Sequence, residues 1–177
     1  ANLKTVTLGK NLVAVNLTEG MFSYCPSLEN VFVAAGNPNY MSVDGVVYDI
    51  AETILYCYPA AKDPSAHKLA ETLITIADYA FHSFQGKSIT LPESVEIIED
   101  YAFEDTMLES IHIPQNVISI GYRAFYNTDT SNGSLKTLTF AEDSKLEAIH
   151  DYAFYFNNEL TKVVLPDNVT TLGKYAF

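Results

Sequence analysis

The chain has few of the residues that mark several functional classes. Its 177 residues include no tryptophan and only two cysteines, and 10 Lys and Arg residues stand against 22 Asp and Glu, for a net charge of −12. Nucleic acids and anionic membranes attract clustered basic side chains, so this balance argues against both as partners. No apolar run approaches the roughly 20 residues that span a bilayer. The opening residues also lack the basic and apolar regions of a signal peptide.

Metal, cofactor and catalytic motifs are missing as well. Cys25 and Cys57 are too few for a disulfide framework, and we expect both to be small core residues. There is no Gly-x-Ser-x-Gly elbow and no phosphate-binding glycine loop. No pair of histidines has the helical spacing of a metal site; the four are His67, His82, His112 and His150. The sequence therefore predicts no catalytic residue, no cofactor and no metal.

One motif recurs along the chain. Tyr-Ala-Phe or a close variant is preceded by Ile or Leu five residues before its Phe, with successive spacings of 22, 22, 29 and 23 residues. Such a period marks a solenoid, in which each coil buries its apolar face against its neighbours. We expect residues 1–177 to form one solenoid of about six coils. The motif ends at Phe81, Phe103, Phe125, Phe154 and Phe177.

Each coil carries two apolar segments. Leu108, Ile111 and Ile113 alternate with polar residues, which predicts a short strand with one buried face. Pro114 cannot donate to a strand ladder, so the strand should end there. Stacked coils would align these strands into a parallel sheet. The second apolar segment, which ends at Ile120, predicts either a brief strand or an extended turn.

The Tyr-Ala-Phe segments follow an aspartate in three coils, at Asp78, Asp100 and Asp151. An aspartate in this place predicts an N-cap and one helical turn. A ladder of carboxylates along the solenoid is the alternative. The alanine before each Phe predicts close packing between neighbouring coils.

A longer segment interrupts the repeat between residues 36 and 71. Candidate strands lie at 41–43, 46–48 and 53–58, and Asp44-Gly45 favours a tight hairpin turn between the first two. We expect a small β-meander, inserted in the second coil, that either covers one side of the core or binds a partner. Asn132-Gly133 predicts a turn in the loop that lengthens a later coil.

These features resemble the BspA-like, or Treponema-type, leucine-rich repeat family. The coil length, the Ile-Pro strand ending and the Ala-Phe turn carry the resemblance. Segments 37–40, 43–48 and 58–60 are similar to an interruption often found in that family. Gly86 and the absence of Pro after Phe140 depart from the pattern. The predicted fold is an α/β repeat solenoid: a right-handed leucine-rich-repeat-like coil with a parallel sheet of short strands, short helical turns and the inserted meander.

The resemblance implies a bacterial or protist protein, located at the cell surface or secreted, that binds host or microbial partners. The family shares no set of ligand residues, so candidate binding positions come from the repeat register alone. The register predicts an exposed row on the sheet that is small, polar and almost uncharged. It would suit an extended protein or glycan, unless these residues are merely strand formers. The row comprises Phe32, Thr90, His112, Thr139 and Val164.

Three functional hypotheses follow. The first is a non-enzymatic adhesion module that binds a protein or glycan through the sheet or the meander. The second is a structural spacer that displays another domain and binds nothing. The third, a glycan-active or peptide-active enzyme, has no motif to support it. The apolar edges at both ends of the repeat predict further repeats of a longer chain as partners.

Overall fold

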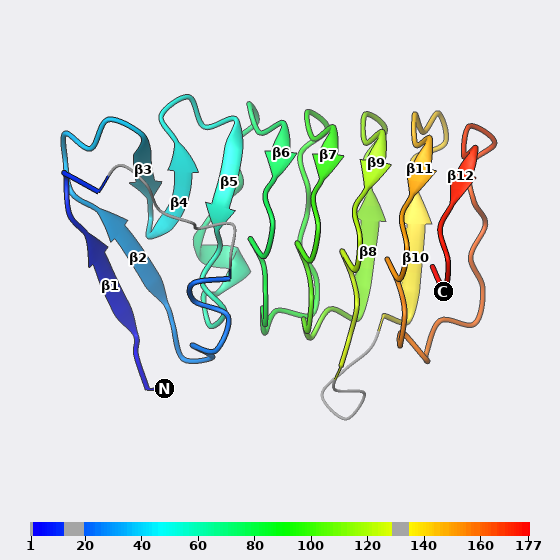
Figure 1. Cartoon of the computed structure of the whole chain (residues 1–177), viewed down its shortest axis with the longest axis horizontal. Helices are drawn as coiled ribbons and strands as arrows, with labels where there is room; N and C mark the ends of the chain where they lie inside the picture. The colour runs from blue at the N-terminus through cyan, green and yellow to red at the C-terminus, as the bar shows by residue number, and fades with distance from the viewer. Residues whose placement is uncertain (1, 13–19, 129–134) are drawn as a thin grey trace.

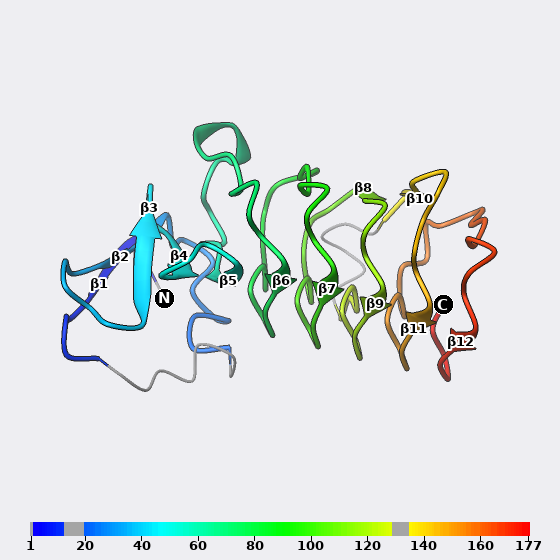
Figure 2. The ribbon, with the colours of Figure 1, turned by 90° about the horizontal axis from the view of Figure 1, so that it is seen from above.

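The fold is a row of coils stacked side by side along the long axis of the molecule (Figure 1). The computed structural model describes residues 2–12, 20–128 and 135–177; the turn predicted at Asn132-Gly133 lies outside these ranges. Figure 2 shows two long sides, with the short strands of the coils along one and the longer β8 (Ser110–Ile113) and β10 (Thr137–Phe140) along the other.

The second apolar segment of each coil forms a brief strand, which settles the alternative left open by the sequence. These two-residue strands hydrogen-bond in parallel from coil to coil, as part of a sheet ordered β12-β11-β9-β7-β6-β5-β4-β3. In each strand, one isoleucine or leucine occupies the same position in the ladder. Ile76 is the direct partner of Ile98, and Ile98 is the direct partner of Ile120. The strands are β6 (Thr75–Ile76), β7 (Ile97–Ile98), β9 (Ser119–Ile120), β11 (Ala148–Ile149) and β12 (Thr171–Leu172).

The alternating segment forms longer parallel strands in two places. β1 (Thr5–Leu8) pairs with β2 (Asn30–Val33), and β8 pairs with β10. Pro114 follows β8 directly, as expected of a residue that cannot donate to a ladder. The coil that carries Thr90 lies on the other side of β8 but forms no strand there. Its Lys87 carbonyl accepts hydrogen bonds from the amides of both Glu109 and Ser110. The predicted parallel pairing is thus present, but as two short ladders.

The predicted helical turn at Tyr-Ala-Phe is wrong. The tyrosine has a left-handed backbone, with φ of 57° at Tyr79 and Tyr101 and 60° at Tyr152, and a residue of this hand cannot continue a right-handed helix. Nor does the preceding aspartate cap a helix, because its carboxylate bonds to the next coil. In each bond a backbone amide donates to the Oδ1 of the aspartate one coil earlier: Asp100 N to Asp78 at 2.9 Å, Tyr122 N to Asp100 at 2.7 Å and Lys174 N to Asp151 at 2.7 Å.

Burial and neighbouring charge raise the pKa of two carboxylates here, Asp78 of the ladder and the adjacent Glu99. Burial and the nearby Asp100 charge raise the pKa of Asp78. Burial and then the charge of Asp78 raise the pKa of Glu99 above its ordinary value of 4.5. Glu99 Oε2 accepts a bond from the Asp78 amide at 3.2 Å, so a neutral amide in its place could still accept this bond.

We expect Glu99→Gln to increase the free energy of unfolding at pH 7. Because the folded state raises the pKa of Glu99, it binds the proton more tightly than the unfolded state. The ionised side chain therefore costs stability above the raised pKa, and this cost disappears as the pH falls through it toward 4.5. Urea unfolding at several pH values should show the gap between variant and parent closing as the pH falls. A gap that stays constant would contradict this assignment.

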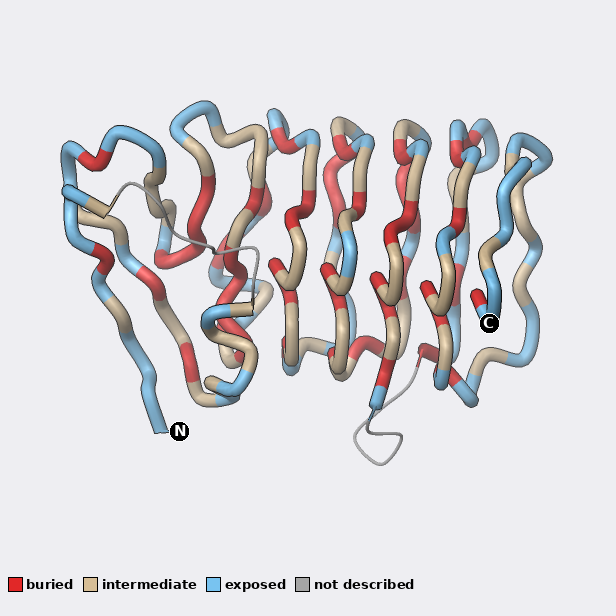
Figure 3. Tube along the Cα trace, in the orientation of Figure 1, coloured by how far each residue is buried: buried red, intermediate tan, exposed pale blue. Residues whose placement is uncertain are grey.

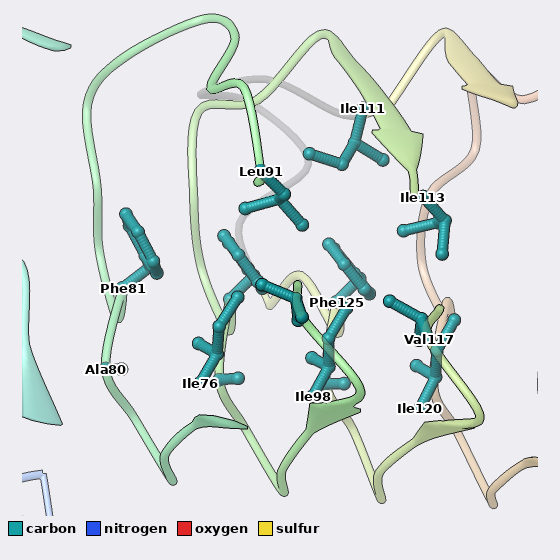
Figure 4. Packing of buried hydrophobic residues seen from close by; sticks show 14 of the residues in the cluster. Ile76, Ala80, Phe81, Leu91, Ile98, Ile111, Ile113, Val117, Ile120 and Phe125 are labelled. Atoms are coloured by element: carbon teal, nitrogen blue, oxygen red, sulfur yellow. The ribbon is translucent and has the colours of Figure 1, made fainter. Parts of the chain in front are cut away.

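The core is a stack of phenylalanine rings flanked by aliphatic rows (Figure 4). Rings of successive coils lie parallel with centroids 4.6 Å apart for Phe81 and Phe103 and 4.8 Å apart for Phe103 and Phe125. The stack continues through Phe154 to Phe177. Buried residues run through the interior of the coils, and the last coil is mostly exposed (Figure 3). The repeated motif thus places one ring per coil on a common axis.

Before Phe81 the stack continues with a tyrosine. Tyr58 lies 4.8 Å from Phe81 between ring centroids, and its amide donates to the Ala80 carbonyl at 2.7 Å. Tyr58 follows β5 (Ile54–Cys57), which pairs in parallel with β6. It therefore takes the place that phenylalanine has in later coils.

Three strands lie in the predicted meander. β3 (Tyr40–Val43) and β4 (Val46–Asp49) form an antiparallel hairpin around Asp44-Gly45, and β4 pairs antiparallel with β5. A second, smaller core joins β4 and β5 to β1 and β2. Cys57 is buried there and Cys25 packs against it, both as free thiols. The predicted role of both cysteines as core residues agrees with these positions.

Candidate functional site

The surface formed by the outward residues of the coils around β8 and β10 is the candidate site, and we call it the strand face. Four of the five predicted residues lie on it, and all four are exposed: Thr90, His112, Thr139 and Val164. Each stands beside or between inward apolar neighbours; His112, for example, lies between buried Ile111 and Ile113. The alternation of the strand turns His112 and Thr139 outward, and Thr90 and Val164 are exposed in coils that have no strand at this place.

His112 and Thr139 form the centre of the strand face. They are direct partners in the β8–β10 ladder, and His112 Nδ1 lies 2.9 Å from Thr139 Oγ1. The imidazole Nε2 forms no bond with any residue in the described ranges, so it is available to a partner. Together the two side chains present hydrogen-bonding groups without a fixed charge.

Four charges at the margin of the strand face form a chain of ion pairs. The Glu109 carboxylate forms ion pairs with Lys87 and with Lys136, the latter at 3.1 Å. Hydrogen bonds from these two lysines lower the pKa of Glu109. Lys136 also lies 3.6 Å from Glu159. Neighbouring coils thus neutralise one another here, which leaves the predicted polar and weakly charged character of the face intact.

Two hollows open on the strand face. One, of about 430 Å³, lies between segment 64–71 and the coil of Thr90, and its lining includes Lys68 and Ser88. The other, of about 570 Å³, has Thr139 and Val164 in its lining. The short 3-10 helix η2 (Pro64–Ala66) projects on the same side as β8 and β10 (Figure 2). It forms a raised wall beside the first hollow.

His67 is part of the lining of the first hollow, at a position where the next two coils have Ile89 and Ile111. Its side chain is buried, and its Nε2 lies 2.8 Å from the Tyr48 hydroxyl. Its Nδ1 lies 3.3 Å from Asp44 Oδ2. Burial raises the pKa of Tyr48, so this hydroxyl is neutral. We interpret His67 as a satisfied core histidine that fixes the wall to the hairpin.

Phe32, the fifth predicted residue, is separated from the strand face. It pairs with Thr7 in the β1–β2 ladder, which shares no hydrogen bond with β8 or β10. Its side chain is 41% exposed. The structure therefore brings four predicted residues onto one surface and leaves Phe32 on another.

The predicted row of exposed residues did not include Lys68, which lies beside it. Lys68 precedes Phe81 by the same number of residues by which Thr90 precedes Phe103, and it lines the first hollow together with Thr90. The matching distance to the phenylalanine was a usable signal. It was obscured because Lys68 falls within segment 36–71, which was expected to be an insertion in the second coil.

Across 2–12, 20–128 and 135–177, no three His, Cys, Asp or Glu side chains are grouped so that they could hold a metal ion. Within those ranges, no helix is long and apolar enough to cross a membrane.

Known proteins share this architecture. A family model described as a BspA type leucine rich repeat region, in 6 copies, matches residues 60–177. A leucine-rich repeat protein from Eubacterium ventriosum is similar, with a TM-score of 0.65 and 24% identity over 98% of this chain and 58% of that one. The pneumococcal vaccine antigen PcpA is similar with a TM-score of 0.50 and 24% identity, over 97% and 51%.

At this identity, the two structures show the fold alone. This chain covers 58% and 51% of their lengths. No curated protein matches the sequence.

Proposed function

We propose that this chain, which belongs to the BspA-type leucine-rich repeat family, is a non-enzymatic interaction module at a cell surface or in secreted form. Its partner would be an extended protein or glycan of a host or microbe. In this proposal residues 1–177 act as one solenoid, and the inserted segment 36–71 supplies the wall beside the strand face. The family membership supports the surface location.

The arrangement of His112 and Thr139 between two hollows is the observation that carries this proposal. An extended partner can place a group in each hollow and bond to the row between them. Because Glu109 and Glu159 pair with Lys87 and Lys136, and the second hollow is lined by two lysines and two acidic residues, the face carries little net charge and should neither repel nor strongly attract a charged partner. Binding should then depend weakly on salt.

The double variant His112→Ala, Thr139→Ala should weaken binding about 30-fold, because each of the two lost hydrogen bonds contributes about 1 kcal/mol and about 1.4 kcal/mol is tenfold in affinity. The measurement is a titration of the chain against immobilised extracellular-matrix proteins and mucin glycans at low and high salt. Thr171→Ala is the matched control, since Thr171 is an exposed threonine on β12, on the opposite long side. Phe32→Ala, tested separately, shows whether the β1–β2 surface takes part.

The outcomes separate the hypotheses. Saturable binding that survives high salt and falls in the double variant supports the strand face. Equal losses in the double variant and in Thr171→Ala would contradict it. No saturable binding to any of these ligands would favour the structural spacer, whose only role is to display another domain.

A further inference from the structure

Arg123 is the one arginine in the chain, and it interrupts the repeat. It stands where the other motif copies have Tyr79, Tyr101, Tyr152 and Tyr175. Its φ of 52° matches the left-handed backbone of those tyrosines. The backbone of this coil is therefore unchanged, and a guanidinium simply replaces a phenol ring in the row.

The residue before Arg123 is also exceptional. Tyr122 stands where three other coils have the aspartate of the ladder, and the fourth has Lys174. Its amide still donates to Asp100 Oδ1 at 2.7 Å. The coil thus gains a cation and, at the adjacent position, lacks the carboxylate that could neutralise it.

Three tyrosine rings surround the guanidinium. Arg123 Cζ lies 4.7 Å from the ring centroid of Tyr126, 5.2 Å from that of Tyr122 and 5.5 Å from that of Tyr152. These cation–π contacts hold the side chain in place without using its N–H donors. We call Arg123 and these three tyrosines the arginine cage. It belongs to the turns after the short strands and not to the strand face.

No residue in the described ranges accepts a hydrogen bond from the guanidinium. Arg123 Nε is buried and has no hydrogen-bond partner, and among the described residues no carboxylate forms an ion pair with this side chain. The neighbouring carboxylates are engaged elsewhere. Asp151 accepts from the Lys174 amide, Asp105 accepts from the Thr128 amide at 2.6 Å, and Glu104 lies 3.5 Å from His82.

We propose that the arginine cage binds the carboxylate of an acidic sugar. A guanidinium matches a carboxylate with two parallel hydrogen bonds, and the two terminal Nη groups of Arg123, which are not among the buried unpartnered atoms, can donate both. The surrounding tyrosines offer apolar ring surface and hydroxyl groups, a combination that fits the pyranose ring carrying the acid. A polyanion is disfavoured, because the chain has a net charge of −12 and a single arginine. The cage is independent of the proposed function, since none of its residues lies on the strand face.

The test is a titration followed by NMR, using the Nε–H resonance of Arg123. Because the chain has one arginine, this signal is unique. The probes are the methyl glycosides of N-acetylneuraminic acid and glucuronic acid, with methyl galactoside as the neutral control and acetyl-glutamate amide as the peptide control. We expect saturable shifts of the Nε–H signal with one or both acidic sugars, and at least tenfold weaker binding of both controls. The two acidic sugars distinguish which carboxylated ring the cage accepts.

Variants that restore the repeat provide matched controls. Arg123→Tyr and Tyr122→Asp each introduce the residue found in other coils, so both should fold. Arg123→Tyr should abolish acidic-sugar binding, monitored by backbone amide shifts, and Tyr122→Asp should weaken it at least tenfold by supplying an internal carboxylate. Unchanged binding in Arg123→Tyr would overturn the proposal. So would equal binding of the neutral sugar or the glutamate derivative, or no saturable shift in the parent, and none of these results bears on the strand face.

Discussion

Replacing Phe103 with alanine is expected to lower the free energy of unfolding by roughly 3–5 kcal/mol. Its ring is fully buried and stacks between Phe81 and Phe125 at centroid distances of 4.6 and 4.8 Å. The variant would leave a cavity in the middle of the stack and weaken the contacts with both neighbouring coils. Contacts between adjacent coils are the main source of stability in a solenoid. Urea unfolding followed by circular dichroism measures the loss.

Phe177→Ala is the internal control for this experiment. Phe177 belongs to the same stack but has one ring neighbour, Phe154, and is 48% exposed. Its replacement should therefore cost less than that of Phe103. Equal unfolding midpoints for Phe103→Ala and the parent would show that the stack does not hold the coils together.

Ala102→Leu should destabilise the protein by about 1–3 kcal/mol through overpacking. Ala102 is fully buried, and its carbonyl accepts a bond from the Phe81 amide at 2.7 Å, so the neighbouring coil lies directly against it. A leucine side chain would push the two coils apart or force strained rotamers.

Ala51→Leu provides the matched control, because Ala51 is exposed in a turn. It should change the free energy of unfolding by less than about 0.5 kcal/mol. Both variants can be followed by the same urea titration. If Ala102→Leu unfolded at the same urea concentration as the parent, close coil-to-coil packing at this alanine would be contradicted.

Much of the core could be predicted because the repeat is regular. The alternation that gave Ile111 and Ile113 inward places and His112 an outward place is a property of the strand itself. The Ala-Phe pairs at the end of each coil were expected to be buried, and Ala102, Phe103, Ala124 and Phe125 are. The resemblance to the BspA-like family, drawn from the same residues, is confirmed by the family match.

The helical turn could not be predicted correctly from local preference. Asp before Tyr-Ala-Phe is an acceptable N-cap in isolation, yet the amide it accepts from belongs to a coil about 22 residues further on, as for Asp78 and Asp100. That partner exists only once the coils stack. Similarly, Tyr58 lies outside the Tyr-Ala-Phe motif and was assigned to a strand, and only its contact with Phe81 places it in the aromatic stack.

The candidate binding surfaces were also predicted only in part. The register placed Thr90, His112, Thr139 and Val164 in one outward row, but it also included Phe32, which the structure puts on the separate β1–β2 ladder. The arginine cage was not singled out at all. Arg123 and Tyr122 were visible as departures from the repeat, but the three rings around the guanidinium come from two coils.

The sequence by itself determined the period of the solenoid, the inward residues of each coil and the family, because these depend on spacing along the chain. Only the tertiary structure decided where the repeat ladders break, how the aspartates bond, which outward residues share a surface and which cation lacks a partner. Those features depend on contacts between coils. Such contacts are made by backbone amides and side chains far apart in sequence, and no local pattern records their distances.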